Sequence, residues 1–171
     1  SIHMHMREIC IWSCKFVTST SEELEAVTIT ENTKLRTVKF TFDKTLPIGL
    51  GGKLVINYKG ILNNAMAGFY ISNYTDAEGQ KKKLASTQFE ALDARRAFPC
   101  VDEPAMKATF TLSLTIPKVL TALSNMPESL STYLSNGMKK VTFQKSPKMS
   151  TYLLAWAVGE VDCIRSQSKN G

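Results

Sequence analysis

The 171-residue sequence is poor in histidine, with only His3 and His5, both at its start. Since the rest of the chain has no histidine, Ser-His-Asp and Cys-His catalytic sets have no base there. The sequence also has no HExxH zinc motif and no G-x-S-x-G nucleophile elbow. A His-x-His pair can bind a metal, but residues 1–4 resemble a vector scar. We therefore expect no metal site and no catalytic residue in this chain.

Cysteine is also scarce, and none of it forms a CxxC pair; the four residues are Cys10, Cys14, Cys100 and Cys163. On one strand, Cys10 and Cys14 would lie about 13 Å apart, too far for a disulfide. Free thiols are the simplest interpretation, and they are typical of a reducing compartment. We therefore expect a cytoplasmic protein.

No apolar run approaches the ~18 residues that a membrane-spanning helix needs, and charged residues from Arg7 onward interrupt any signal-peptide pattern. The net charge is +6, which leaves open a basic β-domain that binds anionic partners. However, no nucleic-acid-binding motif is present. The densest basic run, Lys81–Lys83, is more simply a solvated hairpin tip. We expect neither a membrane nor a nucleic acid as partner.

Hydrophobic residues alternate with polar ones along much of the chain, which is typical of half-buried β-strands. One-face sets are Cys10, Trp12, Cys14 and Phe16; Val38, Phe40 and Phe42; Leu54, Ile56 and Tyr58; Phe110, Leu112, Leu114 and Ile116; and Val141 and Phe143. Residues 152–158 are almost all apolar, which suggests a strand buried on both faces.

Turn signals separate these runs at residues 47–52, 63–64, 76–79 and 127 and at Asn136-Gly137. The best helical candidate is short, from Glu90 to Ala97, and ends before Phe98-Pro99. The sequence predicts an all-β fold of about nine or ten mostly antiparallel strands in saddle-shaped or sandwich-like sheets. We assign residues 1–6 to a tag scar and frayed start, and residues 7–171 to a single β-domain.

One irregular stretch, residues 85–107, breaks the alternation and concentrates charge. A long non-strand segment in a β-domain is a common place for function. Asp102 and Glu103 could act as an acid–base pair, but adjacent residues on an extended chain point to opposite sides. The favoured alternative is an ion pair with Arg95 or Arg96 that fixes the loop.

Within this stretch, Gln88 and Glu90 are two residues apart, so on an extended backbone their side chains face the same way. A carboxylate beside an amide suits a ligand with a cationic amine: the carboxylate pairs with the ammonium group, and the amide fixes a neighbouring polar group. A solvated β-face is the alternative.

The segment from Thr87 to Pro104, TQFEALDARRAFPCVDEP, resembles a signature of the aminopeptidase N family of zinc peptidases, and it is most similar to the puromycin-sensitive group. Other similar pieces follow in family order: Gly68-Phe69-Tyr70, Lys107–Phe110, Ala122–Pro127, Met149–Leu154 and Val158–Glu160. The resemblance covers about residues 8–171. It implies a saddle of β-sheets as the first domain of a larger enzyme, in agreement with the alternation.

By this resemblance, Glu90 would bind the free α-amino group of a peptide, and Gln88 would line the pocket for its first side chain. The resemblance also implies a cis peptide bond at Glu90–Ala91. Ile71, Leu92 and Val101 depart from the usual family residues, and we expect these changes to be tolerated.

The family's zinc-binding HExxH helix and its Gly-x-Met-Glu-Asn motif are not in this sequence. We therefore expect a substrate-binding domain that is not catalytic alone, with zinc in the catalytic domain of the parent chain. Its expected partners are a peptide N-terminus, that catalytic domain and, through exposed strand edges, a second copy of the fragment. The alternative function is a non-catalytic interaction or scaffold module, so enzyme status stays open.

Overall fold

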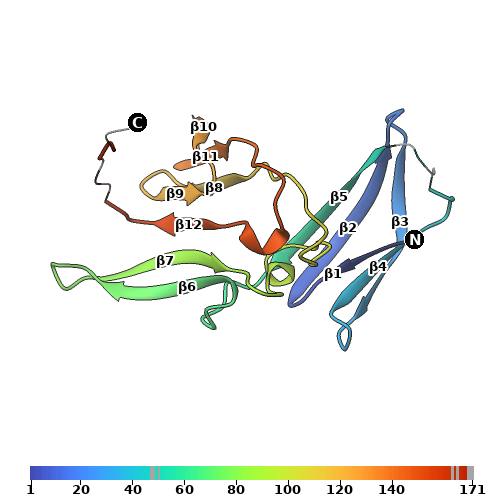
Figure 1. Ribbon diagram of the computed structural model, residues 1–171, viewed down its shortest axis with the longest axis horizontal. Helices are drawn as coiled ribbons and strands as arrows, with labels where there is room; N and C mark the ends of the chain where they lie inside the picture. The colour runs from blue at the N-terminus through green and yellow to red at the C-terminus, as the bar shows by residue number, and fades with distance from the viewer. Residues whose placement is uncertain (47–48, 50, 163, 165, 169–171) are drawn as a thin grey trace.

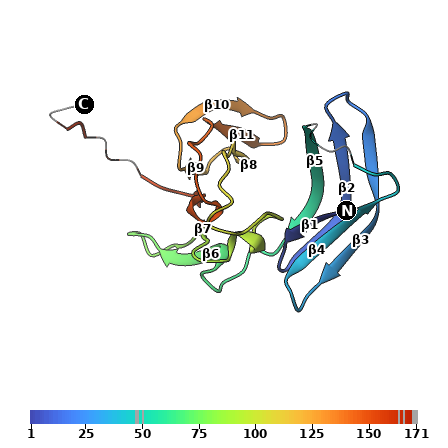
Figure 2. The ribbon, with the colours of Figure 1, turned by 45° about the vertical axis from the view of Figure 1, so that its right-hand side comes forward.

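The computed structural model describes residues 1–46, 49, 51–162, 164 and 166–168, and these form an all-β structure, as the alternation predicted. Figures 1 and 2 show one large curled sheet beside two smaller sheets. The described residues contain β1 (Ile2–His5), β2 (Ile9–Thr18), β3 (Glu23–Asn32), β4 (Thr37–Phe42), β5 (Gly52–Gly60), β6 (Gly68–Thr75), β7 (Lys81–Gln88), β8 (Ser113–Pro117), β9 (Thr121–Ser124), β10 (Glu128–Tyr133), β11 (Met138–Phe143) and β12 (Trp156–Gly159).

The strands form three sheets in which the neighbours pair antiparallel. The five-stranded sheet has the order β1-β4-β3-β2-β5, the three-stranded sheet β10-β11-β8, and the four-stranded sheet β6-β7-β12-β9. The β6–β7 hairpin extends away from the five-stranded sheet (Figure 1). The segment between β7 and β8, residues 89–112, contacts all three sheets: it packs against side chains of β6, β8 and β12, and Cys100 exchanges backbone hydrogen bonds with His5 of β1.

The five-stranded sheet buries one apolar face, and β4, which lies between β1 and β3, supplies three of its buried side chains. Val38, Phe40 and Phe42 are all buried, as their period-two spacing predicted. Leu54, Ile56 and Tyr58 of β5 pack against the same cluster. The alternation from Phe110 to Ile116 also holds, although the regular strand begins only at Ser113.

The predicted face of β2 is wrong because the strand contains an irregularity. Its register with β5 shifts between Ile11 and Ser13, as at a β-bulge. A bulge adds one residue and reverses the side-chain alternation on either side of it. Cys10 is therefore exposed and Trp12 is 63% exposed, whereas Cys14 is 2% exposed.

The first six residues include a strand that the sequence analysis did not predict. Ile2–His5 forms β1, an edge strand that pairs with β4 from Ile2↔Phe40 to His5↔Thr37. Met6 is 2% exposed and belongs to the core of the five-stranded sheet. The sequence contained a signal for this strand, because Ile2, Met4 and Met6 alternate with two histidines.

The hairpins follow the turn signals. Gly79 between β6 and β7 has φ +79°, and Gly137 between β10 and β11 has φ +76°, a conformation that glycine adopts at little cost. Of the predicted turn at residues 47–52, positions 47, 48 and 50 lie outside the described residues.

The apolar run at residues 152–158 is not one buried strand. Thr151–Leu153 forms a short 3₁₀ turn, and β12 begins only at Trp156. Leu153 is 48% exposed, whereas Trp156 is buried against Phe69 and Phe89. An apolar run of this length does not distinguish a strand from a short turn, because hydrophobicity without a period carries no geometry.

Candidate functional site

Gln88 and Glu90 are both exposed, and they flank Phe89, which is 2% exposed. Gln88 is the last residue of β7 and pairs with Gly68 of β6. Since Phe89 points into the core, the neighbouring side chains on either side of it point outward. The peptide bond between Glu90 and Ala91 is cis, as expected.

Phe89 fixes this segment to the core of the smaller sheets. Its ring lies edge-on to Phe98, with centroids 6.0 Å apart, and edge-on to Trp156, with centroids 5.3 Å apart. Ala94 belongs to the same cluster and is fully buried. A phenylalanine in such a cluster has few alternative positions. The backbone on both sides of Phe89 is therefore held in place, while the amide and carboxylate beside it remain accessible.

After Glu90 the chain makes a short turn rather than a helix. Asp93 N donates to Phe89 O at 3.0 Å, and residues Ala94–Arg96 form a single 3₁₀ turn. The predicted helix from Glu90 to Ala97 is thus limited to its last part. Proline at position 99 disfavours helical backbone at Phe98 and so limits the segment at its end.

Arg95 and Asp102 form the ion pair that the sequence favoured. Arg95 Nε lies 2.8 Å from Asp102 Oδ2, and Arg95 Nη2 donates to Asp102 O at 3.2 Å. The backbone N of Arg95 also donates to Asp102 Oδ2, at 3.3 Å. Asp102 is 2% exposed and Arg95 is 7% exposed. This pair closes the loop across seven residues and, being buried, is poorly screened by solvent.

Arg96 has different partners. Its Nε donates to Asp93 Oδ1 at 2.8 Å, and its Nη1 donates to Glu8 Oε2 at 2.5 Å. Glu8 belongs to the link between β1 and β2, so this contact ties the loop to the five-stranded sheet.

Residues near the amino terminus hold the same loop from the other side. The backbones of His5 and Cys100 exchange two hydrogen bonds, His5 N to Cys100 O at 2.8 Å and Cys100 N to His5 O at 3.1 Å. Asp102 N donates to His5 Nδ1 at 3.1 Å, and Arg7 N donates to Arg95 O at 2.9 Å. Sequence reasoning missed this role because it excluded the first six residues from the fold.

The buried thiols are poor nucleophiles. Burial raises the pKa of Cys100 to about 12, with a further increase from the nearby Asp102 carboxylate. Burial also raises the pKa of Cys14 to about 11, and Glu25 adds to the effect. Cys10, Cys14 and Cys100 are free thiols, whereas Cys163 lies outside the described residues.

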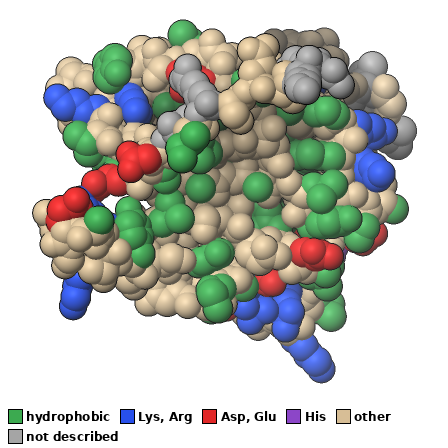
Figure 3. All heavy atoms as spheres, turned by 60° about the vertical axis from the view of Figure 1, so that its left-hand side comes forward, with side chains coloured by type: hydrophobic (Ala, Val, Ile, Leu, Met, Phe, Trp, Pro, Cys, Tyr) green, Lys and Arg blue, Asp and Glu red, His purple; other side chains and the backbone are tan. Residues whose placement is uncertain are grey.

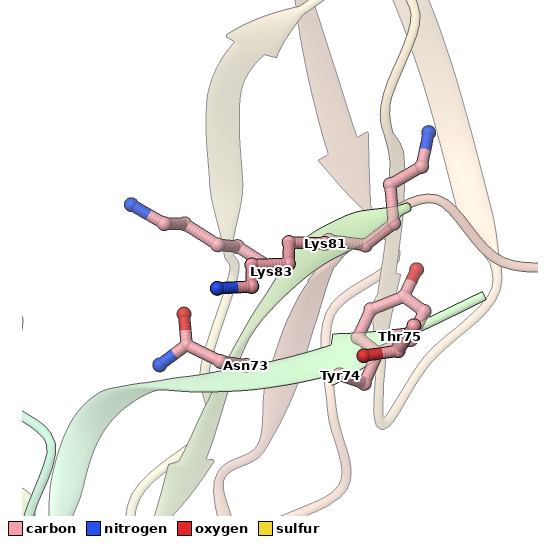
Figure 4. A pocket seen from close by; sticks show the side chains of 6 residues that line it. Asn73, Tyr74, Thr75, Lys81 and Lys83 are labelled. Carbon is pink, nitrogen blue, oxygen red and sulfur yellow. The ribbon is translucent and has the colours of Figure 1, made fainter. Parts of the chain in front are cut away.

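The basic run Lys81–Lys83 lies on the β6–β7 hairpin. Together with Asn73, Tyr74 and Thr75 it lines a shallow hollow (Figure 4). Lys81 and Lys83 are exposed, in keeping with a solvated tip, whereas Lys82 donates to Glu160 Oε2 at 2.7 Å. Gln88 and Glu90 do not line this hollow.

In the part of the chain that the structure describes, no group of three or more His, Cys, Asp and Glu side chains could hold a metal ion. His3 and His5 therefore do not complete a metal site with described residues. No helix among the described residues is long and apolar enough to cross a membrane.

Comparison with known proteins places these features in a family. The protein-family model named peptidase M1 N-terminal domain matches residues 1–153 of the chain. The chain belongs to this family. Residues 1–6, of which Ile2–His5 form β1, fall within the match. Leu92 and Val101, two of the departures from the usual family residues, are exposed.

Several curated relatives of this domain are aminopeptidases. The chain is 41% identical to puromycin-sensitive aminopeptidase of Caenorhabditis elegans, over 99% of the chain and 18% of the relative. It is 48% identical to aminopeptidase M1-C of Oryza sativa subsp. japonica, over 76% of the chain and 14% of the relative. It is 46% identical to alanine/arginine aminopeptidase of Saccharomyces cerevisiae, over 81% of the chain and 16% of the relative. The chain thus spans less than a fifth of each relative.

Proposed function

We propose that this chain is the substrate-binding N-terminal domain of a zinc aminopeptidase that removes N-terminal residues from peptides, and that it is not catalytic alone. Glu90 binds the α-ammonium group of the peptide, and Gln88 lines the pocket for the first side chain. The observation that carries the proposal is the placement of these two side chains: both are exposed, and both flank the anchored Phe89.

The chemistry of the pair fits a peptide N-terminus. A carboxylate accepts charge-assisted hydrogen bonds from an ammonium group, and these are about twice as strong as neutral ones. A fixed backbone reduces the entropy that binding would otherwise cost. The names of the relatives, which are aminopeptidases, support the same substrate class.

The hydrolytic step belongs to the remainder of the parent polypeptide. A zinc ion bound there would supply the chemistry of this step, polarisation of the scissile carbonyl and activation of water. The described residues of this chain do not offer a ligand set for it. The role of the chain is to hold the substrate amine and to dock against the catalytic domain. We further propose a cytoplasmic location, on the basis of the free thiols.

The test uses the full-length polypeptide that contains residues 1–171. It should release the first residue of a peptide with a free amine and leave the same peptide intact after N-acetylation, because acetylation removes the charge that Glu90 binds. Removal of the metal with a chelator should abolish the activity, and added Zn²⁺ should restore it. Equal cleavage of the free and acetylated peptides would overturn the proposed role. A full-length polypeptide that binds no zinc and cleaves neither peptide would support the scaffold alternative.

As an isolated fragment, the chain should also self-associate. Every residue of the edge strand β10 is exposed, including Leu130 at 60% and Tyr133 at 73%. Hydrophobic side chains are spread over the face shown in Figure 3. An exposed strand edge with apolar side chains is a common site of strand pairing between copies. Sedimentation velocity should show dimers or larger species at high concentration, and Ser131→Pro in β10 should reduce them. A monodisperse monomer would contradict this expectation.

A further inference from the structure

The segment that follows Glu90, residues 91–102, donates a hydrogen bond to a side chain outside it, His5 of β1. We infer that His5 is a positioning residue for substrate binding: its imidazole accepts the Asp102 N–H and thereby holds the Arg95–Asp102 pair that fixes the turn after Glu90. This inference rests on the proposed function of Glu90.

The first step is the hydrogen bond itself. Asp102 N lies 3.1 Å from His5 Nδ1. Because a backbone N–H can only donate, Nδ1 is the acceptor and the imidazole carries its proton on Nε2. Asp102 is 2% exposed, so little water can replace this acceptor. Without it, a buried backbone N–H would lack a partner.

The second step connects Asp102 to the turn. Its carboxylate receives hydrogen bonds from both the side chain and the backbone N of Arg95. Arg95 lies in the 3₁₀ turn Ala94–Arg96. The turn continues back to the site through Arg96 N to Asp93 O at 3.1 Å and Asp93 N to Phe89 O at 3.0 Å. A shift of Asp102 is thus transmitted to the residues on both sides of Glu90.

The third step is that β1 itself is fixed. It pairs with β4 over four residues, and Met6, next to His5, is buried in the core of the five-stranded sheet. Arg7 N donates to Arg95 O at 2.9 Å, one more link between this segment and the turn. His5 therefore connects a strand that is held in the five-stranded sheet to a loop that has little regular structure of its own.

His3 provides a matched control. It is the other histidine of β1, it is exposed, and it pairs with Lys39 in the same ladder. Replacement of His3 by phenylalanine changes the same residue type on the same strand without removing an acceptor from the loop.

The experiment uses the full-length polypeptide and an aminoacyl nitroanilide with a free amine, and it normalises rates to the folded protein. His5→Phe keeps a ring but removes the acceptor; it should raise KM about fivefold to tenfold with kcat within about twofold. His5→Asn places an amide oxygen near the position of Nδ1 and should restore KM to within about twofold of the parent. His3→Phe should leave both constants unchanged.

A second readout is the hydrogen exchange of the Asp102 amide, which should be faster in His5→Phe and restored in His5→Asn. Faster exchange with an unchanged KM would overturn the positioning role, as would unchanged exchange. If His5→Phe does not fold, His5→Gln takes its place, because the longer glutamine side chain carries its amide group past the position of Nδ1. A KM of His5→Gln equal to that of the parent enzyme would then overturn the inference.

Glu90→Gln in the same assay separates the two claims. If Glu90→Gln leaves KM unchanged, the proposed function fails, and the inference about substrate binding fails with it. If Glu90→Gln raises KM and His5→Phe does not, the function stands and only the role of His5 is lost.

Discussion

Arg95 Nε lies 2.8 Å from Asp102 Oδ2, and both side chains are almost completely buried. The guanidinium group also reaches the Asp102 carbonyl oxygen, so one arginine satisfies both the side chain and the backbone of its partner. Such a pair is costly to break, because the remaining charge would stay buried without compensation. The pair therefore joins the two ends of the segment 95–102, which follows Glu90 in the chain.

Asp102→Ala should lower the free energy of unfolding by about 3–5 kcal/mol, since it leaves the Arg95 guanidinium buried and unpaired. Urea unfolding followed by tryptophan fluorescence measures this loss, because Trp156 lies in the core beside the loop. Glu22→Ala is the control: its partner Lys44 is exposed, so the unfolding midpoint should not change measurably. Equal midpoints for the two variants would contradict the structural role of the buried pair.

Gly68→Ala, a substitution in β6 opposite Gln88, should lower the free energy of unfolding. Gly68 pairs with Gln88 and has φ +74°, and an added Cβ would lie 2.6 Å from Arg96 Cβ. The positive φ alone costs about 1–2 kcal/mol for alanine, and the contact with Arg96 adds to it.

Gly79→Ala is the matched control for this substitution, because Gly79 has φ +79° but open space around its Cβ position. Urea unfolding should therefore show a larger loss for position 68 than for position 79. An equal loss would mean that the close approach of Arg96 contributes nothing.

The three described thiols should differ in reactivity. In a Cys163→Ser background at pH 7.5, iodoacetamide should modify Cys10, which is exposed, before Cys14 and Cys100. Their raised pKa values of about 11 and about 12 keep the buried thiols protonated and unreactive. Mass spectrometry of the digested protein measures the order of modification. Rapid labelling of Cys100 in the folded protein would contradict its burial.

The same pKa shifts predict a pH dependence of stability. In the folded protein the pKa of the Cys100 thiol is raised above its unfolded value of about 8.5. The contribution of the protonated thiol to the free energy of unfolding is therefore complete below about pH 8.5. It is lost as the pH rises toward the folded pKa of about 12 for Cys100. As the pH rises from 8 to 10, the urea concentration at the unfolding midpoint should decrease. In Cys100→Ala this midpoint should decrease less steeply. Identical slopes would contradict the assignment of this shift to Cys100.

Gln88→Ala should change which first residues are preferred more than it changes the requirement for a free amine, because Gln88 is assigned to the side-chain pocket. A panel of aminoacyl nitroanilides, each with a free and an acetylated amine, measures both properties of the full-length polypeptide. A uniform loss over all first residues would contradict this assignment.

Much of the fold could be predicted because strands without a bulge follow the period-two rule, as Val38, Phe40 and Phe42 show. The hairpin at Asn136-Gly137 was predictable from a separate signal, a glycine that adopts a positive φ in the turn. The exposure of Gln88 and Glu90 followed from the period-two rule applied across one buried residue. The pairing of Asp102 with an arginine was predictable from charge, but the choice of Arg95 over Arg96 depended on tertiary contacts.

Three features could not be obtained in this way. The shift at Trp12 reverses a face of β2, and no residue type at that position predicts a bulge. The apolar run before Trp156 lacks a period, so its division into a turn and a strand is set by packing. The link between His5 and Asp102 joins residues 97 positions apart, and such long-range contacts leave no local pattern.

The central claim is that Glu90 binds the substrate amine, and the measurement that tests it most directly is the steady-state kinetics of Glu90→Gln in the full-length polypeptide. The variant keeps the size of the side chain and removes its charge. The account predicts a loss of kcat/KM of about 10- to 150-fold, which corresponds to a charged hydrogen bond of about 1.5–3 kcal/mol. Glu78→Gln, an exposed glutamate in the β6–β7 turn, should behave as the unmodified enzyme. If Glu90→Gln also retains the kcat/KM of the unmodified enzyme, the account is wrong.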